Sequence, residues 1–166
     1  MPSTAVLNSE QTMSAFIAAG ANTEDTIISN DEFFPAVDPN LFRSLMRLDN
    51  SVTNPRIRQA LIDAMGKTNT DLAAWQTTQQ NQGNADLSNV AAPQIDGKTR
   101  HEHDYQRAVY CQAKAEITER YQDYDTTAAG TSHAEEIENS IDDYKRQARF
   151  AIRRILGQSQ STIELI

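Results

Sequence analysis

The sequence is poor in the residues that mark several common protein classes. A single cysteine, Cys111, excludes an internal disulfide framework, and five prolines and six glycines exclude collagen-like or proline-rich low complexity. No stretch approaches the roughly 18 apolar residues of a membrane span. The first basic residue is Arg43, so the positively charged start of a signal peptide is missing. We therefore expect a soluble protein of a reducing cytoplasm, with no membrane partner.

An excess of basic residues is also missing. The chain has 15 Lys and Arg against 23 Asp and Glu, a formal charge of -8, which argues against a protein that wraps nucleic acid by neutralising phosphates. Hydrophobic residues make up 39% and aromatic residues 7% of the 166, so the core is modest beside the surface. We expect one domain that completes its burial on a neighbouring molecule.

The first 32 residues form an acidic arm, since Glu10, Glu24 and the other charges in residues 1–32 are all acidic. Two interpretations stay open: a solvated, disordered terminus, or a segment ordered against a partner subunit. Phe33 and Phe34 follow at once, and two adjacent aromatic side chains are costly to leave in water. They are therefore predicted to anchor the arm to a core or to a neighbour.

Two proline-containing signals predict helix starts. Asp38 can accept hydrogen bonds from first-turn amides while Pro39 has no amide to leave unpaired, and Asn54 with Pro55 repeats the signal. The first helix should span about residues 39–49, with an apolar arc wide enough to be covered on two sides. That arc comprises Leu41, Phe42, Leu45, Met46 and Leu48. The second helix, about residues 55–80, has the clearest apolar stripe, and Gly66 lies opposite that stripe.

Two further helices follow a long connection. Residues 80–98 show no sustained period and are predicted to be a loop. The third helix should span about residues 101–123. The fourth opens with a capping box, Ser132 and Glu135, and stops at Gly157. The predicted fold class is all-α: a four-helix bundle-like domain with a long loop between the second and third helices, and extended arms at both ends.

No residue is predicted to be catalytic, cofactor-binding or metal-binding. His101 and His103 are the best metal candidates, but side chains at i and i+2 point to different faces of a helix. Cys111 lacks the helix-start setting that makes a reactive thiolate. No nucleophile elbow or phosphate loop is present. We expect no enzyme and no cofactor.

A basic face lies on the fourth predicted helix, beside its apolar stripe. It comprises Lys145, Arg146, Arg149 and Arg153. On an acidic protein this face should meet acidic groups. Three partners stay open: acids of the third helix or the N-terminal half of the same chain, an acidic face of another subunit, or a DNA backbone passing close by.

The end of the chain, residues 158–166, follows the helix stop and is too apolar for an idle tail. Ile163 and Leu165 alternate with polar residues, as in an extended strand. The segment either folds back on the protein's own helices or inserts into a partner as an extended peptide.

Taken together, motifs along the chain from Phe33 onward resemble the head completion (head-stabilisation) protein family of Peduovirus-type contractile-tailed bacteriophages. The matching residues are Phe33, Phe34, Pro35, Asp38, Pro39, Met46, Arg47, Leu48, Asn69, Leu72, Ile95, Asp96, Gly97, Tyr105, Arg107, Ala108, Val109, Glu119, Arg120, Tyr121, Arg149, Ala151, Arg154, Ile155 and Gly157. Residues 1–32 and 77–93 do not obviously match the family, so any role for them comes from this sequence alone.

The resemblance implies a structural virion protein with no reaction. Such an adaptor binds the portal protein after DNA packaging, extends the DNA channel and gives the tail or a tail-terminator protein its docking site. Copies form a ring, twelvefold like the portal, and DNA passes through the lumen without sequence-specific binding. Its place is the neck of the virion, and the host cytoplasm during assembly.

Within that frame the chain divides into an arm (1–32), a helical adaptor domain (33–157) and a C-terminal tail (158–166). Phe33 and Phe34 are the predicted arm anchor, and the basic face is the predicted subunit interface. The predicted portal-binding residues are Ser161, Thr162, Ile163, Glu164, Leu165 and Ile166. The alternative function is a small helical DNA-binding or regulatory module that uses the basic face; a metal-dependent enzyme is a more distant one.

Overall fold

The computed structural model describes residues 27–125 and 131–158, with the side chains of 121–125 and 131–136 left out. This part of the chain contains four α-helices, α1 (Pro39–Leu45), α2 (Asn54–Asn81), α3 (Arg100–Asp125) and α4 (Thr131–Ile155). A short 3₁₀ helix, η1 (Leu87–Asn89), and a two-residue hairpin, β1 (Gln94–Ile95) with β2 (Lys98–Thr99), lie between α2 and α3. The predicted all-α class is confirmed. None of the described helices is long and apolar enough to cross a bilayer.

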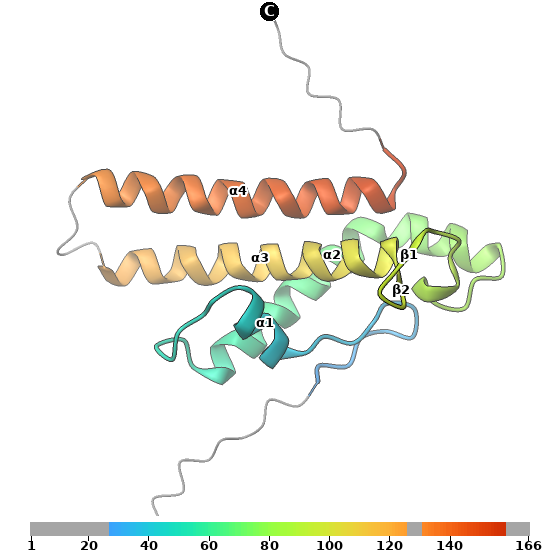
Figure 1. Ribbon diagram of the computed structural model, residues 1–166, viewed down its shortest axis with the longest axis horizontal. Helices are drawn as coiled ribbons and strands as arrows, with labels where there is room; N and C mark the ends of the chain where they lie inside the picture. The colour runs from blue at the N-terminus through green and yellow to red at the C-terminus, as the bar shows by residue number, and fades with distance from the viewer. Residues whose placement is uncertain (1–26, 126–130, 159–166) are drawn as a thin grey trace, which may run out of the picture.

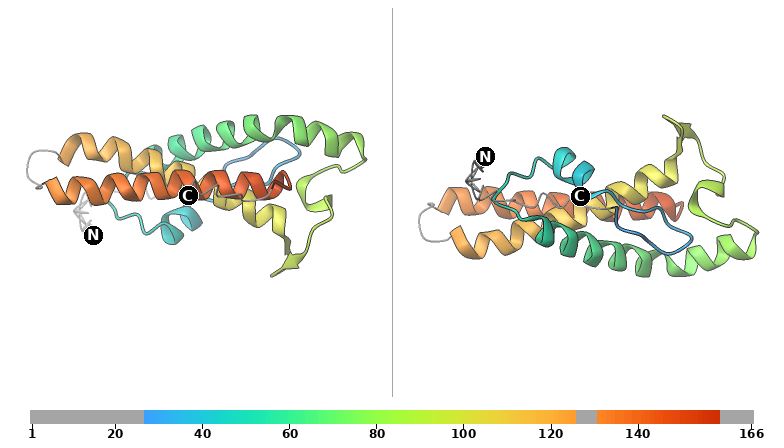
Figure 2. Two further views of the ribbon diagram at one scale, coloured as in Figure 1. Left: turned by 90° about the horizontal axis from the view of Figure 1, so that it is seen from above. Right: turned by 90° about the horizontal axis from the view of Figure 1, so that it is seen from below.

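Helix α3 is the centre of the molecule. Helix α4 runs antiparallel along it, as Figure 1 shows. In the two views of Figure 2, α1 and α2 lie on opposite sides of the α3–α4 pair. Because α3 is covered from several directions, its buried side chains lie around most of its circumference. They include Tyr105, Ala108, Val109, Tyr110, Ala113 and Ile117.

The two proline signals start helices, though by different means. The Asp38 carboxylate accepts from the Asn40 amide at 2.8 Å, as predicted for an N-cap. Asn54 does not cap α2, because its Oδ1 accepts from the Arg43 guanidinium at 2.6 Å. Helix α2 therefore begins one residue early and keeps Pro55 in its first turn, where the missing amide has no cost.

Helix α1 is shorter than predicted, and the described part of the chain covers one side of it. It ends at Leu45 and not at about residue 49, because Arg47 turns the chain with a positive φ of 50°. Phe42 is buried, whereas Leu41 and Leu45 are 40% and 59% exposed. The described residues thus cover α1 on one side and not on two, and its second apolar side faces outward from them.

The connection before α3 is more ordered than predicted. Asp86 caps η1 by accepting from the Ser88 and Asn89 amides, which places Leu87 in the core. The hairpin turns at Asp96 and Gly97, whose φ values of 51° and 72° fit a type I′ turn. Neither element was predicted, because elements of two or three residues are too short to show a hydrophobic period.

Helix α3 opens with a capping box that was also missed. The Thr99 hydroxyl accepts from the Glu102 amide at 3.3 Å, while the Glu102 carboxylate accepts from the Thr99 amide at 2.7 Å. The predicted box at Ser132 and Glu135 falls on side chains outside the described residues. Gly157 ends α4 as predicted, with a φ of 68° and the Gln158 amide donating to the Arg153 carbonyl.

Candidate assembly surfaces

Residues 27–37 form a strap across α2 and α3. Ile28 and Val37 exchange two backbone hydrogen bonds of 2.8 and 2.9 Å, which closes the strap into a loop. Phe33 and Phe34 lie at its tip and are 2% and 3% exposed. The Phe34 ring stacks on Tyr105 with a centroid distance of 4.8 Å. The aromatic pair is therefore buried in this chain's own core, and holding the preceding arm stays a prediction, because residues 1–26 lie outside the described part.

A closed ring of three side chains fixes the strap to the helices. The Asn30 amide donates to Tyr105 Oη at 2.7 Å, Tyr105 donates to Asn69 Oδ1 at 2.6 Å, and Asn69 donates back to Asn30 Oδ1 at 2.9 Å. Burial raises the pKa of Tyr105, which keeps the hydroxyl protonated and able to donate. Residues from the strap, α2 and α3 are thus joined by bonds whose loss would leave buried polar atoms unpaired.

The side chains of residues 101–104 each make a different contact. The His101 ring meets Trp75 edge-on at 5.6 Å, and burial lowers the pKa of His101 while the nearby Asp104 opposes that shift. Glu102 caps α3, and His103 Nε2 lies 2.9 Å from the Ile95 carbonyl. In the described residues no three His, Cys, Asp or Glu side chains converge on one point that could hold a metal.

Asp104 of α3 joins α3 to α4. It is 3% exposed and accepts from Arg154 of α4 at 2.6 and 3.0 Å, and from Arg100 at 3.2 Å. No sequence pattern predicted this pairing of Asp104. A buried carboxylate fifty residues from its arginine leaves no signal in local spacing, so only the fold could reveal this pair.

Cys111 is a structural residue. The thiol is buried, and burial raises its pKa although Arg107 opposes that shift. A protonated, enclosed thiol is a poor nucleophile. Cys111 therefore packs as a small apolar side chain at the contact of α3 with α4.

The predicted basic face divides into two halves. Lys145 forms an ion pair with Glu119 of α3, and Arg146 pairs with Asp143 on its own helix at 2.7 Å. Arg149 and Arg153 are exposed and have no ion pair with any described residue. Pairing within the chain therefore satisfies the half of the face nearer the start of α4, and the half nearer its end stays open to a partner.

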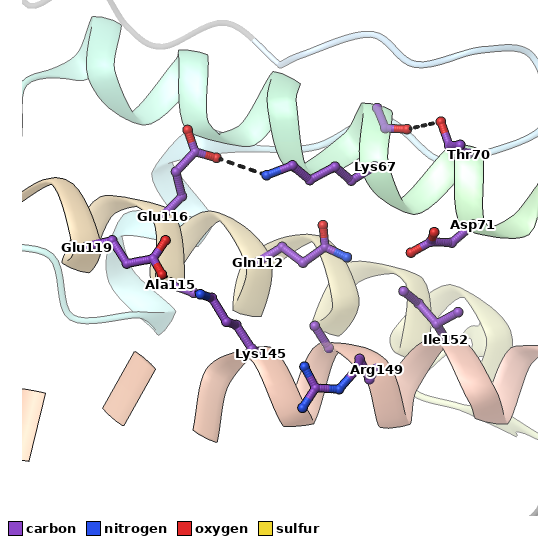
Figure 3. A pocket seen from close by; sticks show the side chains of 12 residues that line it. Lys67, Thr70, Asp71, Gln112, Ala115, Glu116, Glu119, Lys145, Arg149 and Ile152 are labelled. Atoms are coloured by element: carbon purple, nitrogen blue, oxygen red, sulfur yellow. Dashed lines mark hydrogen bonds and ion pairs between the residues drawn. The ribbon is translucent and has the colours of Figure 1, made fainter. Parts of the chain in front are cut away.

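A groove runs between α2 and α4, with α3 at its bottom (Figure 3). Its volume is about 560 Å³. Ala115 of α3 and Ala148 and Ile152 of α4 are small or apolar lining residues and are buried. Gln112 of α3 lines the groove as well, and its buried Oε1 has no hydrogen-bond partner among the described residues. Two charges on its walls, Asp71 of α2 and Arg149 of α4, have no ion-pair partner among the described residues. We call this feature the α2–α4 groove.

In the described part of the chain, apolar side chains of α1 are exposed, and the exposed charges Asp71, Arg149 and Arg153 lack ion-pair partners. Such surfaces are typical of a helical protein that packs against other molecules. Residues 28–166 match the phage head completion protein (GPL) family, and the chain belongs to that family. Its role is accordingly that of a structural component of a phage particle.

A curated relative supports the same assignment. The head completion/stabilization protein of Escherichia phage P2 is 34% identical over 143 residues, which is 86% of this chain and 85% of the relative. No solved structure matches this chain significantly. The family resemblance predicted from the sequence is confirmed. The predicted portal-binding residues, 161–166, lie outside the described part.

Proposed function

We propose that copies of this chain bind the portal protein once DNA is packaged, extend the DNA channel as a ring and present the docking site for the tail or a tail-terminator protein. The observation that carries the proposal is the 34% identity to a head completion protein across 86% of the chain. The unpaired surfaces around α1 and α4 fit it, because a ring subunit must expose two different faces to its neighbours. The protein would be placed in the neck of the virion, after assembly in the host cytoplasm.

Residues 161–166 are the proposed portal contact. They follow Gly157, where α4 stops, so the helical body can fold without them. In an extended strand Ile163 and Leu165 point to one side, and burying both is worth about 3 to 6 kcal/mol per subunit before ordering costs. Pairing along the backbone would add directional hydrogen bonds, and a ring would multiply the effect.

Deletion of residues 159–166 tests this contact. We expect helicity by circular dichroism to stay nearly unchanged, while attachment to DNA-filled heads is lost and the heads leak DNA. Ile163→Asp should have the same effect, and Gln160→Asp, which adds the same charge outside the proposed contact, should not. If the truncated protein still completes heads, the tail is not the portal contact, and the arm with Phe33 and Phe34 becomes the better candidate.

The basic face is proposed to meet protein and not the DNA channel. A genome that must leave needs a lining that does not grip phosphates, and an acidic chain can supply one. Arg149 and Arg153, which lack partners in the described residues, are free to meet the acidic N-terminal half of the next copy. A ring structure with all four basic side chains of the face in the lumen would contradict this arrangement.

The same two arginines also favour a second candidate, a helical module that binds DNA through α4. Binding of duplex DNA by the isolated protein, weakening steeply as salt rises, would support that function. The ring proposal instead expects no such binding. It also expects the isolated protein to be mainly monomeric at micromolar concentration, measured by light scattering, because the ring forms on the portal.

A further inference from the structure

The outward side of α1 has no partner within the described part of the chain. Leu41 and Leu45 are one turn apart, so they lie on the same side of α1, and both are exposed. Arg47 follows them, is exposed and has no ion pair among the described residues. We call Leu41, Leu45 and Arg47 the α1 face. It combines two apolar side chains with one cation.

The α2–α4 groove has the complementary chemistry. Its apolar lining of Ala115, Ala148 and Ile152 leaves room for larger apolar side chains between the walls. Asp71 on the α2 wall, which has no ion pair in the described part of the chain, suits Arg47. Arg149 on the α4 wall suits the segment around α1, since residues 31–49 contain four acidic residues and two arginines.

The α1 face and the groove cannot meet within one copy. Tyr110 of α3 contacts α1, with its ring 5.2 Å from that of Phe42 and its hydroxyl donating to the Asp38 carbonyl. Gln112 of the same helix lines the groove. Two residues on, a helix has turned by about 200°, so the two features lie on nearly opposite sides of α3. Figure 2 shows α1 on the side away from the α2–α4 gap.

We propose that the α1 face of one copy docks in the α2–α4 groove of the next copy. Leu41 and Leu45 would cover Ala115, Ala148 and Ile152, and Arg47 would pair with Asp71. Because the contact joins two different faces, it repeats head to tail and closes into a ring when the rotation per copy allows. The inference rests on the proposed ring, and it names the surfaces that build it.

A cysteine pair tests the contact in the full chain. In a variant carrying both Leu45→Cys and Thr70→Cys, each copy has one thiol on the α1 face and one on the groove wall. Mild oxidation of concentrated protein, and of protein bound to its portal, should give a ladder of disulfide-linked dimers, trimers and larger species. Either substitution alone should give no ladder. Cys111 is buried, so it should not contribute to the ladder.

Charge exchange supplies a second readout that does not depend on oxidation. Arg47→Asp or Asp71→Arg alone should weaken association between copies about fivefold, and the double variant should restore it. Helicity of each variant, by circular dichroism, shows that the fold is intact. Failure of the double variant to recover, with intact folds, overturns the proposed pair.

The remaining outcomes separate this inference from the proposed function. A portal that carries rings of the cysteine variant without any ladder leaves the ring proposal standing and overturns this contact. A variant with Thr70→Cys and Ile163→Cys provides the alternative. If this variant cross-links and the variant with Thr70→Cys and Leu45→Cys does not, the groove belongs to the C-terminal tail, and the proposed contact with the α1 face is overturned. A ladder in free protein that fails to bind the portal supports the contact and contradicts the proposed function.

Discussion

Replacing Tyr105 by Phe should loosen the strap while leaving the aromatic core in place. The substitution removes one oxygen and keeps the ring that stacks on Phe34. That oxygen accepts from Asn30 at 2.7 Å and donates to Asn69 at 2.6 Å, and Tyr105 is fully buried. Asn69 Oδ1 would lose its donor and one Asn30 N–H its acceptor, while Asn30 keeps its bond to the Pro35 carbonyl.

The expected cost is about 1 to 3 kcal/mol of unfolding free energy, the range for leaving buried partners of a lost hydrogen bond unpaired. With a urea dependence of roughly 2 kcal/mol per molar for a chain of this size, the midpoint of urea unfolding should fall by about 0.5 to 1.5 M. Amide hydrogen exchange should rise most in residues 28–37, because the lost bonds hold this strap.

Tyr144→Phe is the matched control. The Tyr144 side chain is partly exposed and its hydroxyl has no hydrogen bond with any described residue. Its loss should change stability by less than about 0.5 kcal/mol. If Tyr105→Phe costs no more than Tyr144→Phe, the ring of three hydrogen bonds does not stabilise the strap, and burial of the aromatic side chains alone must do so.

Three further predictions follow from single contacts. Arg154→Met should lower the unfolding free energy by about 1.5 to 3 kcal/mol in urea titrations, because Asp104 stays buried with only Arg100 beside it. His101, whose pKa burial holds below 6.5, should make stability fall as pH drops from 7.5 to 5.5, since the unfolded chain takes up the proton first; His101→Gln should flatten this slope. Gly157→Ala should cost about 1 to 2 kcal/mol for its positive φ, whereas Ala at Gly66, an exposed helical position, should raise the thermal midpoint.

The long helices could be predicted because their signals are local. Proline in the first turn and glycine after the last turn fix the limits of α2 and α4 to within a residue or two. The apolar stripe of α2 agrees with the buried positions from Ile57 to Leu72. Periodicity reports which side of a helix is apolar, and in these helices the apolar side does face the core.

The strap and the end of α1 could not be predicted for the opposite reason. Asn30 lies in an arm whose composition resembles solvated sequence, and its partners are 39 and 75 residues away. Arg47 ends α1 with a positive φ, a conformation that nothing in an arginine side chain favours. Contacts distant in sequence decide both features, so they become visible only once the helices are packed.

The basic face shows how far residue patterns reach toward function. Its position on α4 was predicted, and three partners were left open. The structure pairs Lys145 and Arg146 inside the chain. It leaves Arg149, which lines the α2–α4 groove, and Arg153 exposed and without an ion pair among the described residues. A pattern locates charge on a helix, but neighbouring helices decide which of those charges remain for a partner.

The most direct test of the account is electron cryomicroscopy of DNA-filled heads that carry this protein. We predict a closed ring of copies seated on the portal around the channel axis, with the α1 face of each copy against the α2–α4 groove of the next and residues 161–166 on the portal. Copies scattered over the capsid surface, or a portal with no density for this chain, would contradict the proposed function.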